Sequence, residues 1–160
     1  MHQLTRARLV SGTLVQSPSV PATATWLGRA GLAPFLALPA GMLVDSARLT
    51  LWSNLLSAYA FGILTFLLGA WWGIALLKRY TSVLVLSNVL FLLLLSAFVL
   101  MPAGSFFLAA ATCFFVVLWT ERRHALFAPQ PDYYARLRLQ LSSVASAALI
   151  IAAMLSWNWR

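Results

Sequence analysis

The sequence has very few charged residues for its length. Only 9% of its 160 residues are Asp, Glu, Lys or Arg, and only three are acidic, whereas soluble domains carry about 25% charged residues. Apolar residues make up 62% of the chain, and the mean hydropathy is +0.87. A soluble enzyme, a nucleic-acid-binding domain and a disordered chain all fit this composition poorly. The composition indicates a polytopic membrane protein.

Residues that hold metals or carry out catalysis are equally scarce. Cys113 is the single cysteine, which excludes an internal disulfide framework and a thiolate metal cluster. The two histidines, His2 and His124, are too far apart to form a spaced ligand set for haem or metal. The sequence also contains no nucleophile–base pattern and no phosphate-binding loop. We therefore expect no cofactor, no metal and no enzymatic activity.

Long apolar runs dominate what remains. A bilayer core of about 30 Å requires about 20 apolar residues in a helix, and five runs approach or exceed that length. The first run contains Arg29, Pro34 and Pro39, so four spans with a re-entrant first segment is the alternative. The sequence predicts an all-α bundle of five transmembrane helices in one membrane domain, 26–160, with spans at about 26–44, 54–77, 82–101, 103–120 and 139–157.

The distribution of basic residues predicts the orientation. With five spans, nine Lys or Arg residues lie on the side of the N-terminus and two on the other, whereas four spans give six against five. Because cytoplasmic loops are enriched in Lys and Arg, we expect a cytoplasmic N-terminus and an external C-terminus. The nine are Arg6, Arg8, Arg29, Lys78, Arg79, Arg122, Arg123, Arg136 and Arg138, and the two are Arg48 and Arg160.

Residues 1–25 are basic and rich in hydroxyl side chains, and they contain no acid. The stretch lacks the apolar segment of a secretory signal. We expect a disordered cytoplasmic tail of a bacterial inner-membrane protein, and the alternative is a presequence that directs the chain to the mitochondrial inner membrane.

Small residues form a stripe on the second span. Gly62, Gly69 and Gly73 lie seven and four residues apart, so they share one helical face, which Ala58 extends. Such a face lets another helix approach closely in lipid. We expect Gly69 to pack against the first span, with a membrane protein partner or a homo-oligomer as the alternative. Similar stripes occur on two other spans, at Ala33, Ala37 and Gly41 and at Ala148, Ala152 and Ser156.

Aromatic and basic residues cluster near one membrane surface. Trp71 and Trp72 are expected to anchor the second span in the interface, with a packed pocket for Trp72 against the first span as the alternative. Residues 121–138 are expected to connect the last two spans as a loop. The last helix of the chain is expected to begin near residue 133, with Asp132 as its N-cap. Residues of the 121–138 segment are predicted to contact anionic lipid headgroups or to act as a topology anchor; they are Arg122, Arg123, Tyr133, Tyr134, Arg136 and Arg138.

Few polar residues lie within the spans. Asn54, Thr65, Asn88 and Thr112 are expected to bond within or between helices, and Asn88 is the most in need of a cross-helix partner. Asp45 and Arg48 are expected to form a solvated surface pair. No span contains a central ionisable residue of the kind that proton relays and coupled transport use.

Three stretches resemble an uncharacterised family of small bacterial membrane proteins that is related to the animal mitochondrial protein named transmembrane protein sixty-nine. The stretches are LGRAGLAPF (Leu27–Phe35), TFLLGAWWGIAL (Thr65–Leu76) and PDYYARLRLQLS (Pro131–Ser142). Leu68 stands where the family pattern has glycine, and Trp71 where it has histidine. Because the family is a domain of unknown function, the resemblance implies a membrane fold and supplies no activity.

The residues together favour an accessory or assembly protein that packs against the lipid bilayer, anionic lipid headgroups or membrane partners, without nucleic acid. The alternative is a small passive transporter or channel, in which the four polar residues of the spans would have to share one cavity.

Overall fold

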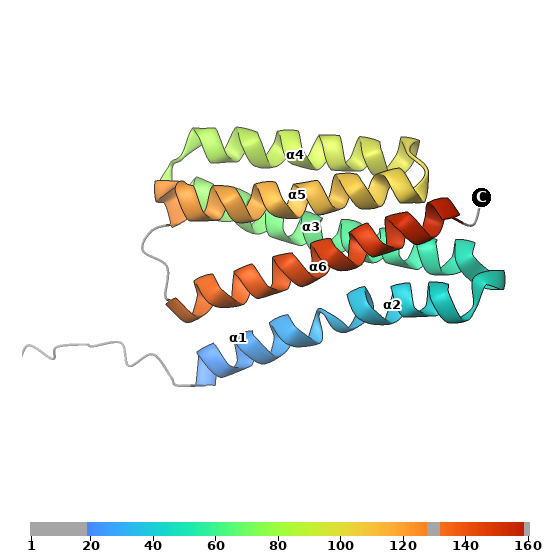
Figure 1. Cartoon of the computed structure of the whole chain (residues 1–160). Coiled ribbons are helices and arrows are strands. Elements are labelled where there is room, and N and C mark those ends of the chain that lie inside the picture. Colours follow the sequence, from blue (N-terminus) through green and yellow to red (C-terminus); the bar gives the residue numbers. More distant parts are fainter. Residues whose placement is uncertain (1–18, 128–131, 159–160) are drawn as a thin grey trace, which may run out of the picture.

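The computed structural model describes residues 19–127 and 132–158, and every element in these ranges is helical (Figure 1). Five helical segments are long and apolar enough to cross a membrane, which confirms the predicted fold class. The elements are α1 (Ser19–Ala30), α2 (Ala33–Val44), the 3-10 turn η1 (Ser46–Arg48), α3 (Leu49–Lys78), α4 (Thr81–Leu100), α5 (Ala103–Arg123), the 3-10 turn η2 (Ala125–Phe127) and α6 (Asp132–Asn158).

The first span is a broken helix made of α1 and α2. The break falls at Gly31 and Leu32, immediately before Pro34, which lies in the first turn of α2 and needs no N–H partner there. The Tyr59 hydroxyl donates a hydrogen bond of 2.8 Å to the carbonyl of Gly31, so the break leaves this acceptor satisfied. The helix also begins at Ser19, so residues 19–25 are helical and do not belong to the predicted disordered tail. Residues 1–18 lie outside the described part.

Consecutive spans run antiparallel, so the ends of the helices lie at two ends of the bundle (Figure 1). The α3–α4 link is two residues long, and Arg79 adopts a left-handed conformation (φ 58°) that ends α3. The start of α1, the α3–α4 link, the end of α5 and the start of α6 lie at one end of the bundle, here called the basic end. The described basic residues that were predicted for the N-terminal side all lie in helices that begin or end here, or in the α3–α4 link.

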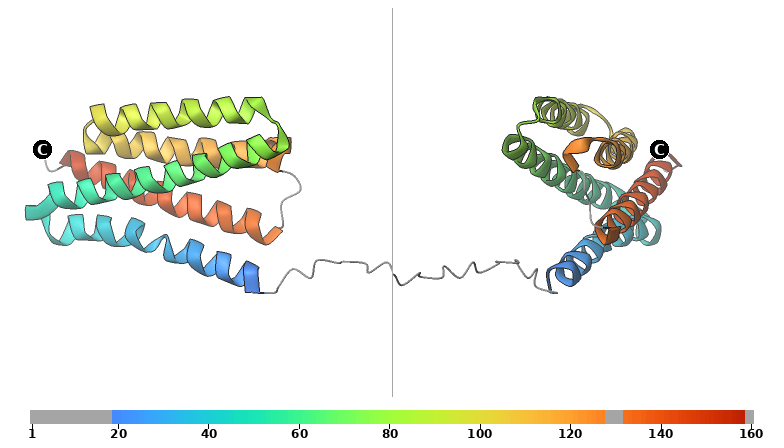
Figure 2. Two further views of the ribbon diagram at one scale, coloured as in Figure 1. Left: turned by 180° about the vertical axis from the view of Figure 1, so that it is seen from behind. Right: turned by 90° about the vertical axis from the view of Figure 1, so that its left-hand side faces the viewer.

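Helices α5 and α6 form the most extensive helix–helix contact in the described part of the chain, and their ribbons can be followed in Figure 2. Small residues line this contact. Ala148, Ala152 and Ser156 of α6 are at most 6% exposed, as their predicted stripe requires. A Cβ added to Gly104 of α5 would lie 3.4 Å from the Cβ of Ser156. Because lipid is as apolar as these helices, such close van der Waals contact is what holds them together.

The segment 121–138 differs from the predicted loop. Helix α5 continues to Arg123 and α6 begins at Asp132, so Glu121 and Arg138 both lie in helices. The start of α6 agrees with the prediction of a last helix beginning near residue 133, while the side chain of Asp132 lies outside the described part. The consequence is that two charged residues assigned to a loop instead face each other across the α5–α6 interface.

Candidate functional site

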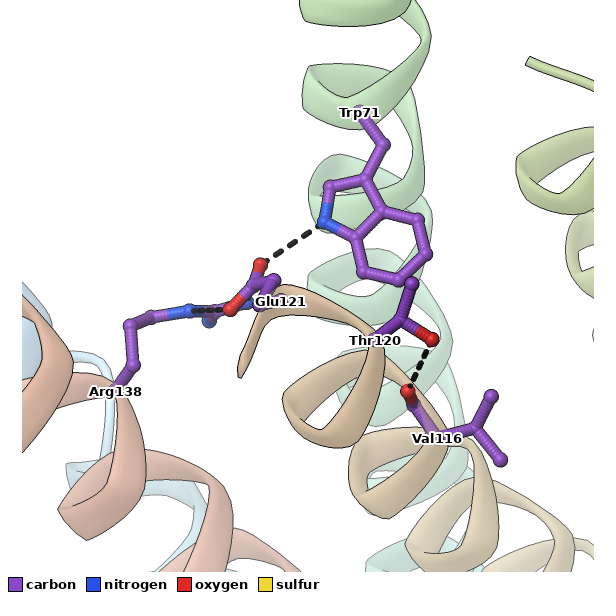
Figure 3. A network of polar contacts seen from close by, with 5 residues as sticks. All are labelled: Trp71, Val116, Thr120, Glu121 and Arg138. Carbon is purple, nitrogen blue, oxygen red and sulfur yellow. Dashed lines mark hydrogen bonds and ion pairs between the residues drawn. The ribbon is translucent and has the colours of Figure 1, made fainter. Parts of the chain in front are cut away.

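A buried network of polar groups connects α3, α5 and α6 near the basic end (Figure 3). Arg138 of α6 donates two hydrogen bonds to the carboxylate of Glu121 in α5, from Nε to Oε2 at 2.8 Å and from Nη2 to Oε1 at 2.6 Å. Trp71 of α3 donates from Nε1 to the same Oε1 at 2.9 Å. The carboxylate therefore accepts from two different helices and ties three spans together.

All three residues of the network are buried. Trp71 is 2% exposed, Arg138 7% and Glu121 8%. A charge removed from water needs a partner and further hydrogen bonds to offset its desolvation. The two-pronged contact of the guanidinium with the carboxylate, completed by the indole N–H, meets that need.

The turn after α5 closes over this network. Lys78 at the end of α3 donates a 2.8 Å hydrogen bond to the carbonyl of Leu126 in η2. Phe127 packs on the Trp71 ring with the two centroids 5.3 Å apart. The amide of Leu126 in turn bonds Nδ1 of His124 at 3.1 Å. The histidine that the sequence left without a role therefore shapes the turn.

Two cavities flank the network. One, of about 620 Å³, is lined mainly by apolar residues of α3 together with Lys78, Glu121 and Arg138. The other, of about 260 Å³, lies between α1, α2, α3, α5 and α6 and includes Arg138 and Ser142. Phe66, Leu67 and Arg138 line both cavities, so the two are neighbours.

The predicted lipid-contacting cluster divides into an exposed set and one buried residue. Arg138 does not face the headgroups as predicted, because its guanidinium is held by Glu121 inside the bundle. The remaining residues are exposed at the basic end, where their contact with lipid headgroups stays a prediction. They are Arg122, Arg123, Tyr133, Tyr134 and Arg136.

Of the two adjacent tryptophans, Trp71 is buried, although a packing role was considered only for Trp72. Trp72 is 46% exposed and does not occupy a packed pocket against the first span, while Trp71 lies in the core. Leu68 is 3% exposed, so it lies in the core together with Trp71. Residues 68 and 71 lie three positions apart, so they share the core-facing side of α3, whereas residue 72 is turned about 100° from residue 71.

The predicted glycine face of α3 is not covered by any other part of the chain that the structure describes. A Cβ added to Gly62, Gly69 or Gly73 would meet no atom of the described residues within 4 Å. The prediction that Gly69 packs closely against the first span is therefore wrong. Close approach occurs instead at Gly41, where an added Cβ would lie 2.9 Å from the Trp52 ring.

The polar residues of the spans do not share one cavity. Thr65 and Thr112 bond the carbonyls four residues before them, and so does Asn88, which was expected to need a cross-helix partner. Thr65 and Asn88 line a groove between α3 and α4, whereas Thr112 lines a separate one between α4 and α5. Asn54 is exposed and lines none of these grooves.

The hydrogen bonds of the network hold its charged side chains in fixed positions. Both carboxylate oxygens of Glu121 accept hydrogen bonds, and the guanidinium of Arg138 is fixed by them. Across the described ranges, no group of three or more His, Cys, Asp or Glu side chains could hold a metal ion. Lys78, Arg138 and Ser142 bring N–H and O–H donors to the walls of the two cavities, which are otherwise mostly apolar.

Sequence reasoning missed Glu121 and Trp71. One signal was available, since Glu121 is one of only three acidic residues and stands directly after an uncharged run. A carboxylate at the end of a membrane span needs a cationic partner if it is buried. This strongly basic chain offers several, and Arg138 is one of them. The choice among them depends on helix rotation, which the sequence pattern does not specify.

The chain was compared with known protein families, with curated proteins and with solved structures. Neither a curated protein nor a solved structure matches it. A family described as a protein of unknown function, DUF3429, matches residues 20–154, which include all five candidate spans apart from the last residues of α6. The chain therefore belongs to the DUF3429 family of unknown function and is a multi-pass membrane protein.

Proposed function

We propose that the protein is a non-enzymatic accessory or assembly protein of the bacterial inner membrane, which acts by packing against a membrane protein partner or a second copy of itself. The N-terminus lies in the cytoplasm in this proposal, because the basic end would then face the side where Lys and Arg accumulate. A mitochondrial inner membrane is the alternative location.

The observation that carries the proposal is the uncovered glycine face of α3. A Cβ built on Gly62, Gly69 or Gly73 would have no described atom within 4 Å apart from the adjoining backbone of α3 itself. Elsewhere in the bundle, as at Gly41 and Gly104, glycine is in close contact with a neighbouring helix. In lipid, small residues support helix association because they let two backbones approach closely. The free face on α3 is therefore suited to a helix from outside the chain.

A passive transporter or channel, the other candidate, has less support. It would require Asn54, Thr65, Asn88 and Thr112 to line one path. Only Thr65 and Asn88 share a groove, of about 240 Å³, and both direct a side-chain hydrogen bond to their own helix.

A pair of glycine variants tests the proposal. Gly41→Leu inserts a side chain against Trp52, so we expect it to destabilise the isolated protein by about 1–3 kcal/mol, as overpacking does. Gly69→Leu should leave the thermal melt of the isolated protein in detergent unchanged. It should, however, remove the larger species seen by blue-native electrophoresis of mildly solubilised membranes.

Leu51→Ala, at an exposed position of the same helix, is the control and should change neither the melt nor the native size. A wild-type protein that migrates as a bare monomer would contradict the proposal. So would a Gly69→Leu variant that keeps the full-size species.

A further inference from the structure

The two cavities beside the ion pair share three wall residues, Phe66, Leu67 and Arg138, and together they are here called the α3–α6 cleft. Its walls are mostly aliphatic and aromatic. Phe66, which lines both cavities, is 72% exposed, and Leu77 at the basic end of the cleft is 86% exposed. The cleft therefore opens sideways to the surface that a membrane protein presents to acyl chains.

One polar side chain in the cleft has no partner within the described residues. Ser142 is 1% exposed and lines the smaller cavity, and its Oγ has no hydrogen-bond partner in the described part of the chain. A buried hydroxyl without a partner carries a desolvation cost, and such groups are rare in folded proteins. A ligand acceptor in the cavity would satisfy it.

Further donors lie at the wider part of the cleft. Lys78 donates one N–H to Leu126, so the ammonium retains two more. Arg138 donates two of its five N–H groups to Glu121. Because Arg138 balances the charge of Glu121, Lys78 leaves the cleft with a net positive charge. The complement of such a set is a ligand rich in oxygen acceptors and negative in charge.

The two donors on α6, Arg138 and Ser142, lie at different depths along that helix. The span begins at Tyr133, so Arg138 lies about 7.5 Å along the helix from its start, and Ser142 lies about 6 Å further toward the bilayer centre. A phospholipid arranges its acceptors in the same order, because the phosphate lies at the surface, the ester carbonyls deeper and the acyl chains deepest.

We propose that the α3–α6 cleft binds one anionic phospholipid. Its phosphate meets the donors of Lys78 and Arg138, an ester carbonyl accepts from Ser142, and an acyl chain lies against Phe66 and Leu67. The site is independent of the glycine face of α3, which borders α4, so either proposal can fail without the other.

Native mass spectrometry of the full chain in detergent tests this site. The delipidated protein is titrated with palmitoyl-oleoyl phosphatidylglycerol, with phosphatidylcholine carrying the same chains, and with oleate. We expect one phosphatidylglycerol to bind about fivefold more tightly than phosphatidylcholine, because choline adds a positive charge beside Lys78. Equal binding of the two phospholipids would overturn the proposal, and equally tight binding of oleate would replace the phospholipid with a fatty acid.

Two matched pairs of variants locate the site. Lys78→Gln should weaken phosphatidylglycerol binding about fivefold, whereas Arg48→Gln, which removes the same charge from an exposed position outside the cleft, should not. Ser142→Ala should weaken binding about fivefold while leaving unchanged or raising the melting temperature of the lipid-free protein, because it removes an unpaired hydroxyl. Ser96→Ala, at an exposed position in α4, should leave lipid binding unchanged.

Two binding results would show that the cleft does not hold a lipid. Ser142→Ala would then bind phosphatidylglycerol as tightly as the wild type, and Lys78→Gln and Arg48→Gln would weaken binding equally through general surface attraction. Either result overturns the proposal. The native size of the wild type, measured separately, bears only on the glycine face.

Discussion

In the described part of the chain, two Arg–carboxylate pairs lie in opposite surroundings. Glu121 and Arg138 pair at 2.6 Å with side chains less than 10% exposed, whereas Asp45 and Arg48 approach only to 3.6 Å with side chains 36% and 70% exposed. The first pair joins two helices and accepts a third bond from Trp71, while the second spans a single turn at the far end of the bundle. An Arg–carboxylate pair therefore holds three helices together where it is buried, but contributes little where it is exposed. Screening by water and the mobility of the side chains weaken the exposed pair.

The largest effect is expected from breaking the buried pair on one side. Glu121→Ala leaves the Arg138 cation inside the bundle without its partner, which typically costs about 3–5 kcal/mol. Unfolding in a denaturing detergent titration, followed by circular dichroism, measures this loss.

A double variant separates the pair's contribution from the cost of an orphaned charge. Glu121→Leu combined with Arg138→Met removes both charges and keeps apolar volume, so most of the stability lost in Glu121→Ala should return. If the double variant is as unstable as Glu121→Ala, the desolvated cation is not the cause of the loss.

Removing the third partner of Glu121 should have an intermediate effect. Trp71→Phe keeps an aromatic ring against Phe127 and deletes the N–H that donates to Oε1. A hydrogen bond to a charged group contributes about 1.5–3 kcal/mol, and the same titration should show a loss of that size. Trp72→Phe, on the exposed neighbour, is the control and should change stability little.

The smallest effect is expected at the exposed pair. Asp45→Asn removes a charge from a side chain that water already screens, and we expect a change in unfolding free energy of at most about 0.5 kcal/mol. Thermal melts in detergent at low and high salt provide the measurement. A loss comparable to that of Trp71→Phe would show that the contrast between the two pairs does not hold.

The local features of the fold were predictable because they depend on nearby residues. Five apolar runs gave five helices, and the solvated pair of Asp45 and Arg48 followed from their spacing. The stripe at Ala148, Ala152 and Ser156 is buried, as its spacing indicated. The break before Pro34 also has a local cause, since proline lacks the N–H that would continue the ladder of helical hydrogen bonds.

Most of the candidate site could not be predicted from the sequence. Its three members are separated by 50 and 17 residues along the chain. Glu121 was assigned to a loop but lies in the last turn of α5, and the sequence pattern did not indicate that it pairs with Arg138. The glycine face shows the same limit, because its spacing indicated a close contact without indicating whether the partner lies inside the chain.

The sequence by itself determined that this protein is a bundle of five apolar helices, because span length and hydropathy follow directly from the thickness and polarity of the bilayer. It also determined which links are short and where basic residues collect. Only the tertiary structure decided that Trp71 rather than Trp72 is buried, that Arg138 pairs with Glu121, and that Gly69 stays uncovered. The physical reason is that helices surrounded by lipid are apolar on all sides, so the hydrophobic pattern does not fix their rotation, which close packing and a few polar contacts set instead.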